Sequence, residues 1–167
     1  MLDQETISRR VAELGKTISR DYEGREPVLI GVLKGSVVFL ADLMRRLTIP
    51  AEVEFISAAS YRHGARREDK VVIGGGVSID LKDRHVLVVE AIVDTGRTVS
   101  LILEKLRMLE PASVEIVTLL DKPTSHRSKL AVKYKGFSIH NEFVIGYGMD
   151  NAQRFRNLPF IGRVLES

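Results

Sequence analysis

Residues 85–98 read HVLVVEAIVDTGRT and decide the fold of this chain. The first nine residues form its most apolar run, so we expect a strand in the middle of a sheet, covered on both faces. Glu90 and Asp94 interrupt the apolar pattern, and a carboxylate in such a strand is costly to bury unless it is paired, hydrogen-bonded or exposed at a cleft. Residues four apart on a regular strand face the same side, so we expect both acids at one site.

A small, hydroxyl-rich turn of Thr95, Gly96 and Thr98 follows this strand and begins an expected helix that runs to Leu109. Free N–H groups and the helix dipole at such a start favour a phosphate, and the glycine lets the backbone approach it closely. In a simpler interpretation, Asp94 or Thr95 only caps the helix. The acid within the apolar strand favours the anion site.

The rest of the chain alternates apolar segments of strand length with amphipathic segments of helical spacing. Further helices are expected over residues 5–22 and 37–47, and further strands over 27–33, 51–58, 71–79 (bent at its three glycines), 114–120 and 143–147. This alternation predicts an α/β fold, with a mostly parallel twisted sheet flanked by helices. Ligands bind such sheets at the carboxyl ends of the strands.

The composition is that of an ordinary globular protein, with 44% hydrophobic and 28% charged residues, and its 167 residues suit one domain, 1–167. The absence of cysteine excludes disulfides, zinc–thiolate sites and cysteine nucleophiles. The four histidines show no metal-ligand spacing. No apolar run approaches the ~20 residues that span a bilayer, and the start lacks a secretory signal. We therefore expect a cytoplasmic protein with no membrane partner.

The net charge is mildly basic, +3 from 25 Lys+Arg against 22 Asp+Glu. The basic residues are spread along the chain, apart from one local cluster within residues 62–70. A nucleic-acid-binding protein usually concentrates them on one face or tail, so we expect no nucleic-acid partner. The cluster fits either a pocket for a small anion or an ordinary solvated surface.

Four other segments are candidates for binding, and each also has an ordinary explanation. Residues 33–36, LKGS, are a strand-to-helix turn, and the polar stretch 61–70 has little to anchor it, as in a mobile loop. Lys122 follows an apolar strand, where a lysine is usually a solvated surface residue. Phe143 begins a strand pattern, and such an aromatic residue is usually part of the core.

Residues 90–98 resemble the phosphoribosyl-diphosphate motif of the type I phosphoribosyltransferases. Several separated segments between Val28 and Arg156 resemble, in the same order, the bacterial hypoxanthine-guanine phosphoribosyltransferases of that family. The resemblance implies a sheet with a small hood and a flexible loop. It also implies transfer of 5-phosphoribose from phosphoribosyl diphosphate to N9 of hypoxanthine or guanine, giving IMP or GMP and pyrophosphate, with Mg²⁺.

The resemblance also implies roles for single residues. Asp94 is implied as the general base or electrostatic partner at N7 of the purine. The phosphate and ribose site is implied at Glu90, Thr95, Gly96, Arg97, Thr98 and Val99, and the pyrophosphate site at Lys34, Gly35 and Arg156, with a cis peptide between Leu33 and Lys34. Ser60 and Tyr61 are implied to open the flexible loop. Lys122, Phe143, Val144 and Asp150 are implied to bind the purine, and Glu90 and Asp150 to hold Mg²⁺.

One position departs from the pattern, because Ala91 stands where the family usually has an aspartate after Glu90. The loss of one acceptor leads us to expect weaker ribose or metal binding, or a compensating group.

Two other functions remain open at this stage. One is a nucleotide-sensing, RNA-binding regulator of pyrimidine synthesis, which resembles the family and shares its T-G-x-T turn. The other is a catalytically weak nucleotide-binding protein, which Ala91 suggests. Lys122 and Phe143 match the purine enzymes and so favour the transferase. The resemblance further implies a homodimer or homotetramer.

Overall fold

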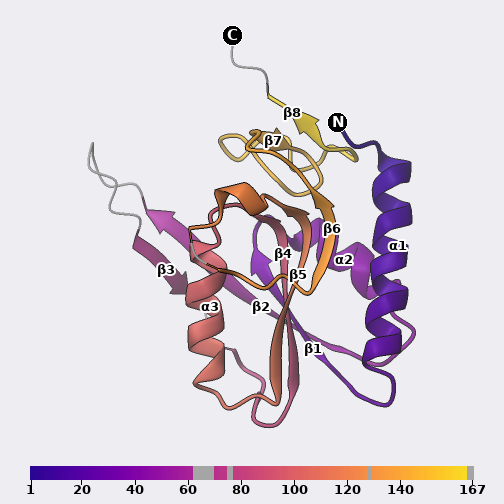
Figure 1. The fold of residues 1–167 in the computed structure, drawn as a ribbon, viewed down its shortest axis with the longest axis vertical. Helices are drawn as coiled ribbons and strands as arrows, with labels where there is room; N and C mark the ends of the chain where they lie inside the picture. The colour runs from indigo at the N-terminus through magenta and orange to yellow at the C-terminus, as the bar shows by residue number, and fades with distance from the viewer. Residues whose placement is uncertain (62–69, 75–76, 128, 165–167) are drawn as a thin grey trace.

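The computed structural model describes residues 1–61, 70–74, 77–127 and 129–164, which form a twisted sheet flanked by helices (Figure 1). The main sheet has six strands in the order β3-β2-β1-β4-β5-β6. They are β1 Val28–Leu33, β2 Glu52–Tyr61, β3 Lys70–Gly74, β4 His85–Val93, β5 Ser113–Asp121 and β6 Tyr134–Ser138. All neighbours run parallel except β2 and β3. The predicted α/β fold with a mostly parallel sheet is confirmed.

The apolar strand β4 occupies the middle of the sheet, between β1 and β5. Its residues 86–89 are fully buried, as expected for a strand that is covered on both faces. Leu87 and Val89 pack into the core on one face of the sheet, and Val86 and Val88 pack into the core on the other. The alternation of a strand therefore distributes one continuous apolar run between two cores.

Helices cover both faces of the sheet. Figure 1 shows α1 (Gln4–Asp21) and α2 (Val37–Met44) on one side and α3 (Arg97–Arg107) on the other. Asp3 caps α1 by accepting a hydrogen bond from the Thr6 N–H at 2.8 Å. Within the described residues, no helix is long and apolar enough to cross a bilayer.

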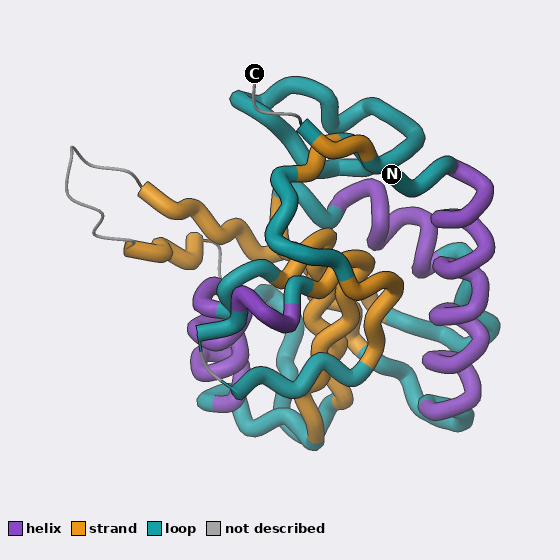
Figure 2. Tube along the Cα trace, turned by 45° about the horizontal axis from the view of Figure 1, so that its top comes forward, coloured by secondary structure: helices purple, strands orange, loops and turns teal. Residues whose placement is uncertain are grey.

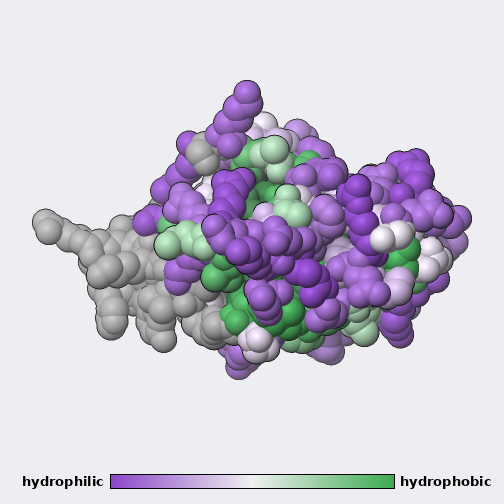
Figure 3. Space-filling model, turned by 90° about the horizontal axis from the view of Figure 1, so that it is seen from below, coloured by the Kyte–Doolittle hydropathy of each residue, from purple (hydrophilic) through white to green (hydrophobic). Residues whose placement is uncertain are grey.

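A second, two-stranded sheet forms the hood, in which β7 (Val144–Ile145) pairs antiparallel with β8 (Gly162–Arg163). Figure 2 shows the hood, with its loops, above the end of the main sheet, close to the N-terminus. The Leu2 and Ile161 backbones bond to each other in both directions, at 2.9–3.0 Å, and attach the hood to the start of the chain. The opposite end of the molecule is mostly hydrophilic, with hydrophobic residues exposed among polar ones (Figure 3).

Several predicted elements need correction. β2 continues to Tyr61 and β3 starts at Lys70, so Ser60 and Tyr61 belong to a strand, paired with Val71 and Lys70. The expected loop is therefore shorter, and residues 62–69 lie outside the described residues. Pairing with the antiparallel strand β3 extends β2 beyond the apolar residues from which its length was predicted.

Two further strand predictions differ from the structure, and one strand was not predicted. Val77 to Ile79 form no strand, and the expected strand 143–147 is reduced to Val144–Ile145, because Gly146 at φ 95° and Tyr147 at φ 50° turn the chain. β6 was not predicted, since its sequence YKGFS has only a weak strand pattern. The second helix ends at Met44 rather than at residue 47.

A prediction concerns Gly15, where α1 meets the end of α2. A Cβ at this position would lie 2.5 Å from the Arg46 Cβ and 2.8 Å from the Arg46 carbonyl oxygen. Alanine favours a helix by ~1 kcal/mol over glycine, but overpacking costs about 1–3 kcal/mol, so we expect Gly15→Ala to lower the free energy of unfolding. Urea denaturation measures this, with the exposed Lys16→Ala as control. A more stable Gly15→Ala protein would contradict the close packing.

Candidate active site

A cleft of ≈ 740 Å³ opens at the carboxyl ends of β1, β4 and β5, where ligands bind in parallel sheets. The residues predicted from the sequence that line it are Lys34, Gly35, Glu90, Asp94, Thr98, Lys122, Phe143, Val144, Asp150 and Arg156. They come from four separate segments of the chain. The parallel arrangement brings them together, because β1, β4 and β5 all end at the same edge.

Asp94 and Lys122 form an ion pair in this cleft. The Lys122 Nζ lies 3.0 Å from the Asp94 Oδ2, and the lysine side chain is 6% exposed while the aspartate is 48% exposed. Asp94 follows β4 directly and Lys122 follows β5 directly, so the pairing of the two strands places the side chains next to each other. The lysine is therefore a buried part of the site and not a solvated surface residue.

The turn after β4 places the start of α3 beside the cleft. Gly96 is the N-cap residue, with φ 78°, and no side chain caps the helix. The interpretation of Asp94 or Thr95 as a mere cap is therefore wrong. The first N–H groups of a helix have no partner within it, and α3 begins at Arg97. Thr98 lies on the wall of the cleft.

The other residues predicted for this turn lie near the cleft rather than on its described wall. Thr95 and Arg97 flank the N-cap glycine. Val99 is buried on α3, and the Gly96 backbone approaches Leu130, whose Cδ2 would be 3.2 Å from a Cβ at the glycine. The Arg127 N–H donates to the Thr95 carbonyl at 3.1 Å.

The Leu33–Lys34 peptide is cis, as the resemblance implied. It ends β1 at the bottom of the cleft, and the buried Ser36 hydroxyl donates to the Val32 carbonyl at 2.7 Å. Gly148 of the hood lies against this turn, because a Cβ on Gly148 would be 2.1 Å from the Gly35 carbonyl oxygen. Lys34 is exposed at the cleft, so its charge is available to an anion.

The hood supplies the opposite wall. The Phe143 ring is 54% exposed at the cleft, whereas Val144 beside it is buried. The interpretation of Phe143 as a core residue is therefore wrong. Asp150 and Arg156 pair at 2.8 Å, and the Arg156 Nη1 donates to the Gly148 carbonyl at 2.8 Å. These bonds orient the guanidinium at the rim of the cleft.

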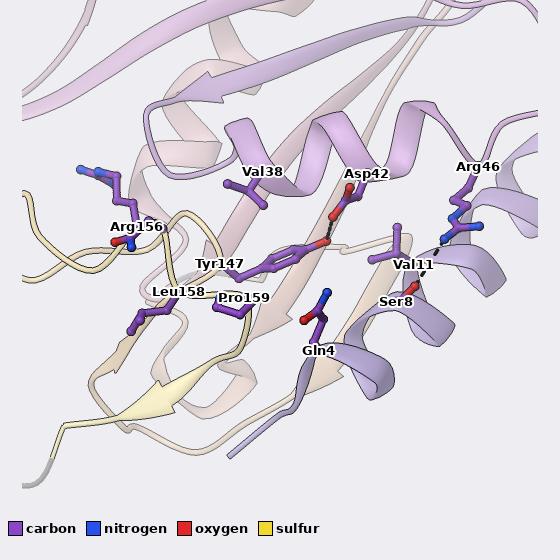
Figure 4. A pocket seen from close by; sticks show the side chains of 11 residues that line it. Gln4, Ser8, Val11, Val38, Asp42, Arg46, Tyr147, Arg156, Leu158 and Pro159 are labelled. Carbon is purple, nitrogen blue, oxygen red and sulfur yellow. Dashed lines mark hydrogen bonds between the residues drawn. The ribbon is translucent and has the colours of Figure 1, made fainter.

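A second, smaller pocket of ≈ 350 Å³ lies between α1, α2 and residues 156–159 (Figure 4). Figure 4 shows the Tyr147 side chain extending from the hood toward α2, where its hydroxyl donates to Asp42. Burial and this bond to an acid raise the pKa of the Tyr147 hydroxyl. Arg156 lines both pockets. The contact of Tyr147 with α2 therefore supports the part of the hood that carries Arg156.

Glu90 is the least compensated acid of the site. Loss of solvent raises the pKa of its carboxyl from 4.5 to about 8, against a smaller opposite effect of its bond to the Ala91 backbone. Within the described part of the chain, no lysine, arginine or histidine lies within 4.0 Å of it. Ala91 is buried beside it and also lines the cleft.

Sequence reasoning missed some residues of the cleft and could not place others. Gln153 lines it, and its Oε1 accepts from the Arg156 Nη2 at 3.1 Å, but nothing in its sequence context points to this role. Met149 also lines the cleft, directly before Asp150 in the hood. Ser60 and Tyr61 end β2, and their side chains lie outside the described residues.

The chain is similar to known proteins over nearly its whole length. The phosphoribosyl transferase domain family matches residues 1–152. Hypoxanthine phosphoribosyltransferase from Salmonella typhimurium is 44% identical over 167 residues, which cover 99% of this chain and 94% of that protein. The protein of the same name from Haemophilus influenzae is 41% identical over 168 residues, with 99% and 94% covered.

Solved structures agree with these sequences. A hypoxanthine-guanine phosphoribosyltransferase from Bacillus anthracis has a TM-score of 0.93 at 41% identity, covering 99% of this chain and 97% of that one. A hypoxanthine phosphoribosyltransferase from Staphylococcus aureus has a TM-score of 0.93 at 38% identity, with 99% and 90% covered. On the match over residues 1–152 and these identities, the chain belongs to the phosphoribosyl transferase domain family.

Proposed function

We propose that this protein is a purine salvage enzyme, a hypoxanthine phosphoribosyltransferase that also takes guanine. It transfers 5-phosphoribose from phosphoribosyl diphosphate to N9 of the base, which gives IMP or GMP and pyrophosphate. The observation that carries this proposal is the pair of Lys122 and Asp94, 3.0 Å apart, in a cleft shared with Phe143 and Lys34. The relatives at 41–44% identity support the same activity, and they disfavour an RNA-binding regulator.

The Lys122–Asp94 pair is complementary to one edge of a 6-oxopurine. In the tautomer with its proton on N7, such a base carries the O6 acceptor and the N7–H donor on the same edge, whereas adenine has an amino group in place of O6. An ammonium group only donates, so Lys122 suits O6 and not an amino group. Asp94 accepts the proton of N7–H, or stabilises positive charge there. The base thus enters between two groups that already neutralise each other.

The hood contacts the purine base in two places, on the face of its ring and along one edge. The exposed Phe143 ring offers its face to the purine plane, the offset arrangement that aromatic rings favour. The Val144 backbone meets the far edge of the base. Asp150 supports this wall through its contact with Arg156.

The phosphoribosyl diphosphate occupies the ends of β1 and β4. The 5-phosphate lies on the turn Thr95–Val99, at the positive dipole end of α3. The pyrophosphate meets the Lys34–Gly35 turn and Arg156. Glu90 lies between these groups, where the ribose hydroxyls bind. The flexible loop that Ser60 and Tyr61 are expected to open lies outside the described residues.

The bonds change at C1 of the ribose. The C1–oxygen bond to pyrophosphate breaks, the N9–C1 bond forms, and the base gives up one proton, which Asp94 receives. Positive charge develops on the sugar as the leaving group departs, so positioning and charge stabilisation provide most of the rate.

Glu90 and Asp150 suit a magnesium ion that is bound with the diphosphate. Mg²⁺ is usually held by one or two carboxylates together with substrate phosphates and water. Glu90 is a half-buried acid with a raised pKa and no cation near it among the described residues, so a cation would compensate its charge. The described residues hold no cluster of three acidic or histidine ligands, which fits a metal that arrives with its phosphates. Bound Mg²⁺ neutralises the diphosphate and makes it a better leaving group.

Two wider properties belong to the same proposal. Phosphoribosyl diphosphate is highly charged and does not cross a membrane unaided, so we place the enzyme in the cytoplasm, where such a substrate is made. We also propose a homodimer or homotetramer. It is supported by the exposed apolar side chains of Val37 and Met44 on α2 and of Val53 and Phe55 on β2.

The function is tested by pyrophosphate release from phosphoribosyl diphosphate with hypoxanthine, guanine, xanthine or adenine. We expect turnover with hypoxanthine and guanine and none with adenine, because Lys122 has no acceptor to bind there. Lys122→Met is expected to weaken the preference for 6-oxopurines. The activity assignment fails if none of the four bases releases pyrophosphate.

Asp94→Asn separates catalysis from binding. The amide keeps the shape and still accepts from Lys122, but it cannot receive a proton, so we expect kcat to fall by roughly 10²-fold or more. The dissociation constant of phosphoribosyl diphosphate is expected to stay close to that of the wild type. Stopped-flow kinetics and calorimetry measure the two quantities, with the exposed Asp83→Asn as control. Equal losses in both would make Asp94 a binding residue only.

Glu90→Gln tests the buried acid through stability. Because its pKa is about 8 in the folded protein and 4.5 ordinarily, the folded protein keeps a proton that the unfolded chain releases. Its contribution to stability is therefore complete below pH 4.5 and is lost as pH rises to about 8. We expect the Tm of Glu90→Gln to exceed that of the wild type by more at about pH 8.5 than at about pH 4.5.

The exposed Glu104→Gln is the matched control and should follow the wild type at both pH values. Mg²⁺ with phosphoribosyl diphosphate should raise the Tm of the wild type by more than that of Glu90→Gln, which keeps the other phosphate contacts. A Tm difference that is independent of pH would contradict the burial of this charge.

A further inference from the structure

A cluster of charged side chains lies behind the cleft, at the end of β5. The Asp121 side chain is 2% exposed, its Oδ2 accepts from the Lys135 Nζ at 3.1 Å, and its Oδ1 lies 2.8 Å from the His126 Nε2. Asp121 Oδ1 and His126 Nε2 are shielded from solvent, and neither makes a well-angled hydrogen bond within the described part of the chain. Such buried groups are uncommon in proteins and call for an explanation.

The cluster holds both ends of one short segment. Asp121 is its first residue and His126 its last, and the 3₁₀ turn Pro123–Ser125 lies between them. The Ser125 N–H donates to the Lys122 carbonyl at 2.9 Å and closes the turn. The contact of 2.8 Å between the end residues therefore makes a loop of residues 121–126, with Lys122 inside it.

The same segment is attached to the turn after β4. The Lys122 N–H donates to the Val93 carbonyl at 2.9 Å, and the Arg127 N–H donates to the Thr95 carbonyl at 3.1 Å. β6 holds it from the other side, because the Ile139 N–H donates to the Asp121 carbonyl at 2.9 Å. A shift of this segment would therefore move the Lys122 amine relative to Asp94.

We propose that Asp121, with His126 and Lys135, is a positioning residue that holds the Lys122 amine at the O6 of the purine. This inference rests on the proposed function of the cleft and adds three residues to the recognition of the base. None of the three lines the cleft, so they act through Lys122. The Lys135 ammonium compensates the buried carboxylate, and the His126 ring lies against its other oxygen, because an unpaired charge in this place is costly. Their contacts thereby fix the path of the backbone that carries Lys122.

Asp121→Asn tests the proposal, since the amide keeps the size of the side chain and removes its charge. We expect the KM for hypoxanthine to rise about tenfold, while the KM for phosphoribosyl diphosphate and kcat change by less than about twofold. Lys135→Met, at an exposed partner, is a second variant that preserves the buried acid and should shift the same KM in the same direction. Lys133→Met is the control, because Lys133 is equally exposed and pairs with Glu115 at 3.4 Å.

A double-mutant cycle decides whether the effect passes through Lys122. In a Lys122→Met background, Asp121→Asn should change the KM for hypoxanthine no further, because the amine that it positions is absent. A full effect in that background overturns the proposal, and so does a fall in Tm without a change in the KM for hypoxanthine. Calorimetric binding of IMP to the wild type tests the proposed function separately: a wild type that neither binds IMP nor makes it would refute that function.

Discussion

Burial of β4 on both faces is the constraint on which the rest of the structure depends. Its residues 86–89 have no contact with solvent. A shift of the strand along β1 and β5 would expose them, so its position and its pairing register are fixed. This position delivers Glu90 and Asp94 to the carboxyl edge of the sheet, where the cleft opens. Since α3 begins three residues after Asp94, the same strand also sets the place of the helix start beside the cleft.

The cleft is arranged around charges that are balanced in different ways. Lys122 is almost fully buried, and its charge is compensated by Asp94 at 3.0 Å. Glu90 has no such compensation among the described residues, and loss of solvent raises its pKa to about 8. A paired charge gives a fixed, neutral docking edge for a base, whereas an unpaired acid favours a ligand that brings a cation. In the proposed reaction, the purine base therefore meets a paired charge, whereas the phosphoribosyl diphosphate with its cation meets an unpaired acid.

The hood and the main sheet are joined by a shared apolar core and by close backbone approaches. A Cβ on Gly148 would lie 2.1 Å from the Gly35 carbonyl oxygen at the end of β1, and, within the hood itself, one on Gly146 would lie 2.0 Å from the Phe160 carbonyl oxygen. Both glycines also have a φ of 95°, a backbone angle that residues with a side chain rarely adopt. These contacts set the distance between the wall that carries Phe143 and the floor at Lys34, and so the width of the cleft.

Local sequence patterns were sufficient for the fold class, the central strand and the acids and turn at its end, because apolar period and strand-end chemistry are local properties. The resemblance added Lys122 and Phe143, whose local sequence favoured a surface and a core residue. Only the tertiary structure decided which acid is paired, where β2 ends, that β6 exists, and that Asp121 is buried. Each of these depends on a neighbour distant in sequence, such as Asp94 for Lys122, and no local pattern encodes such a neighbour.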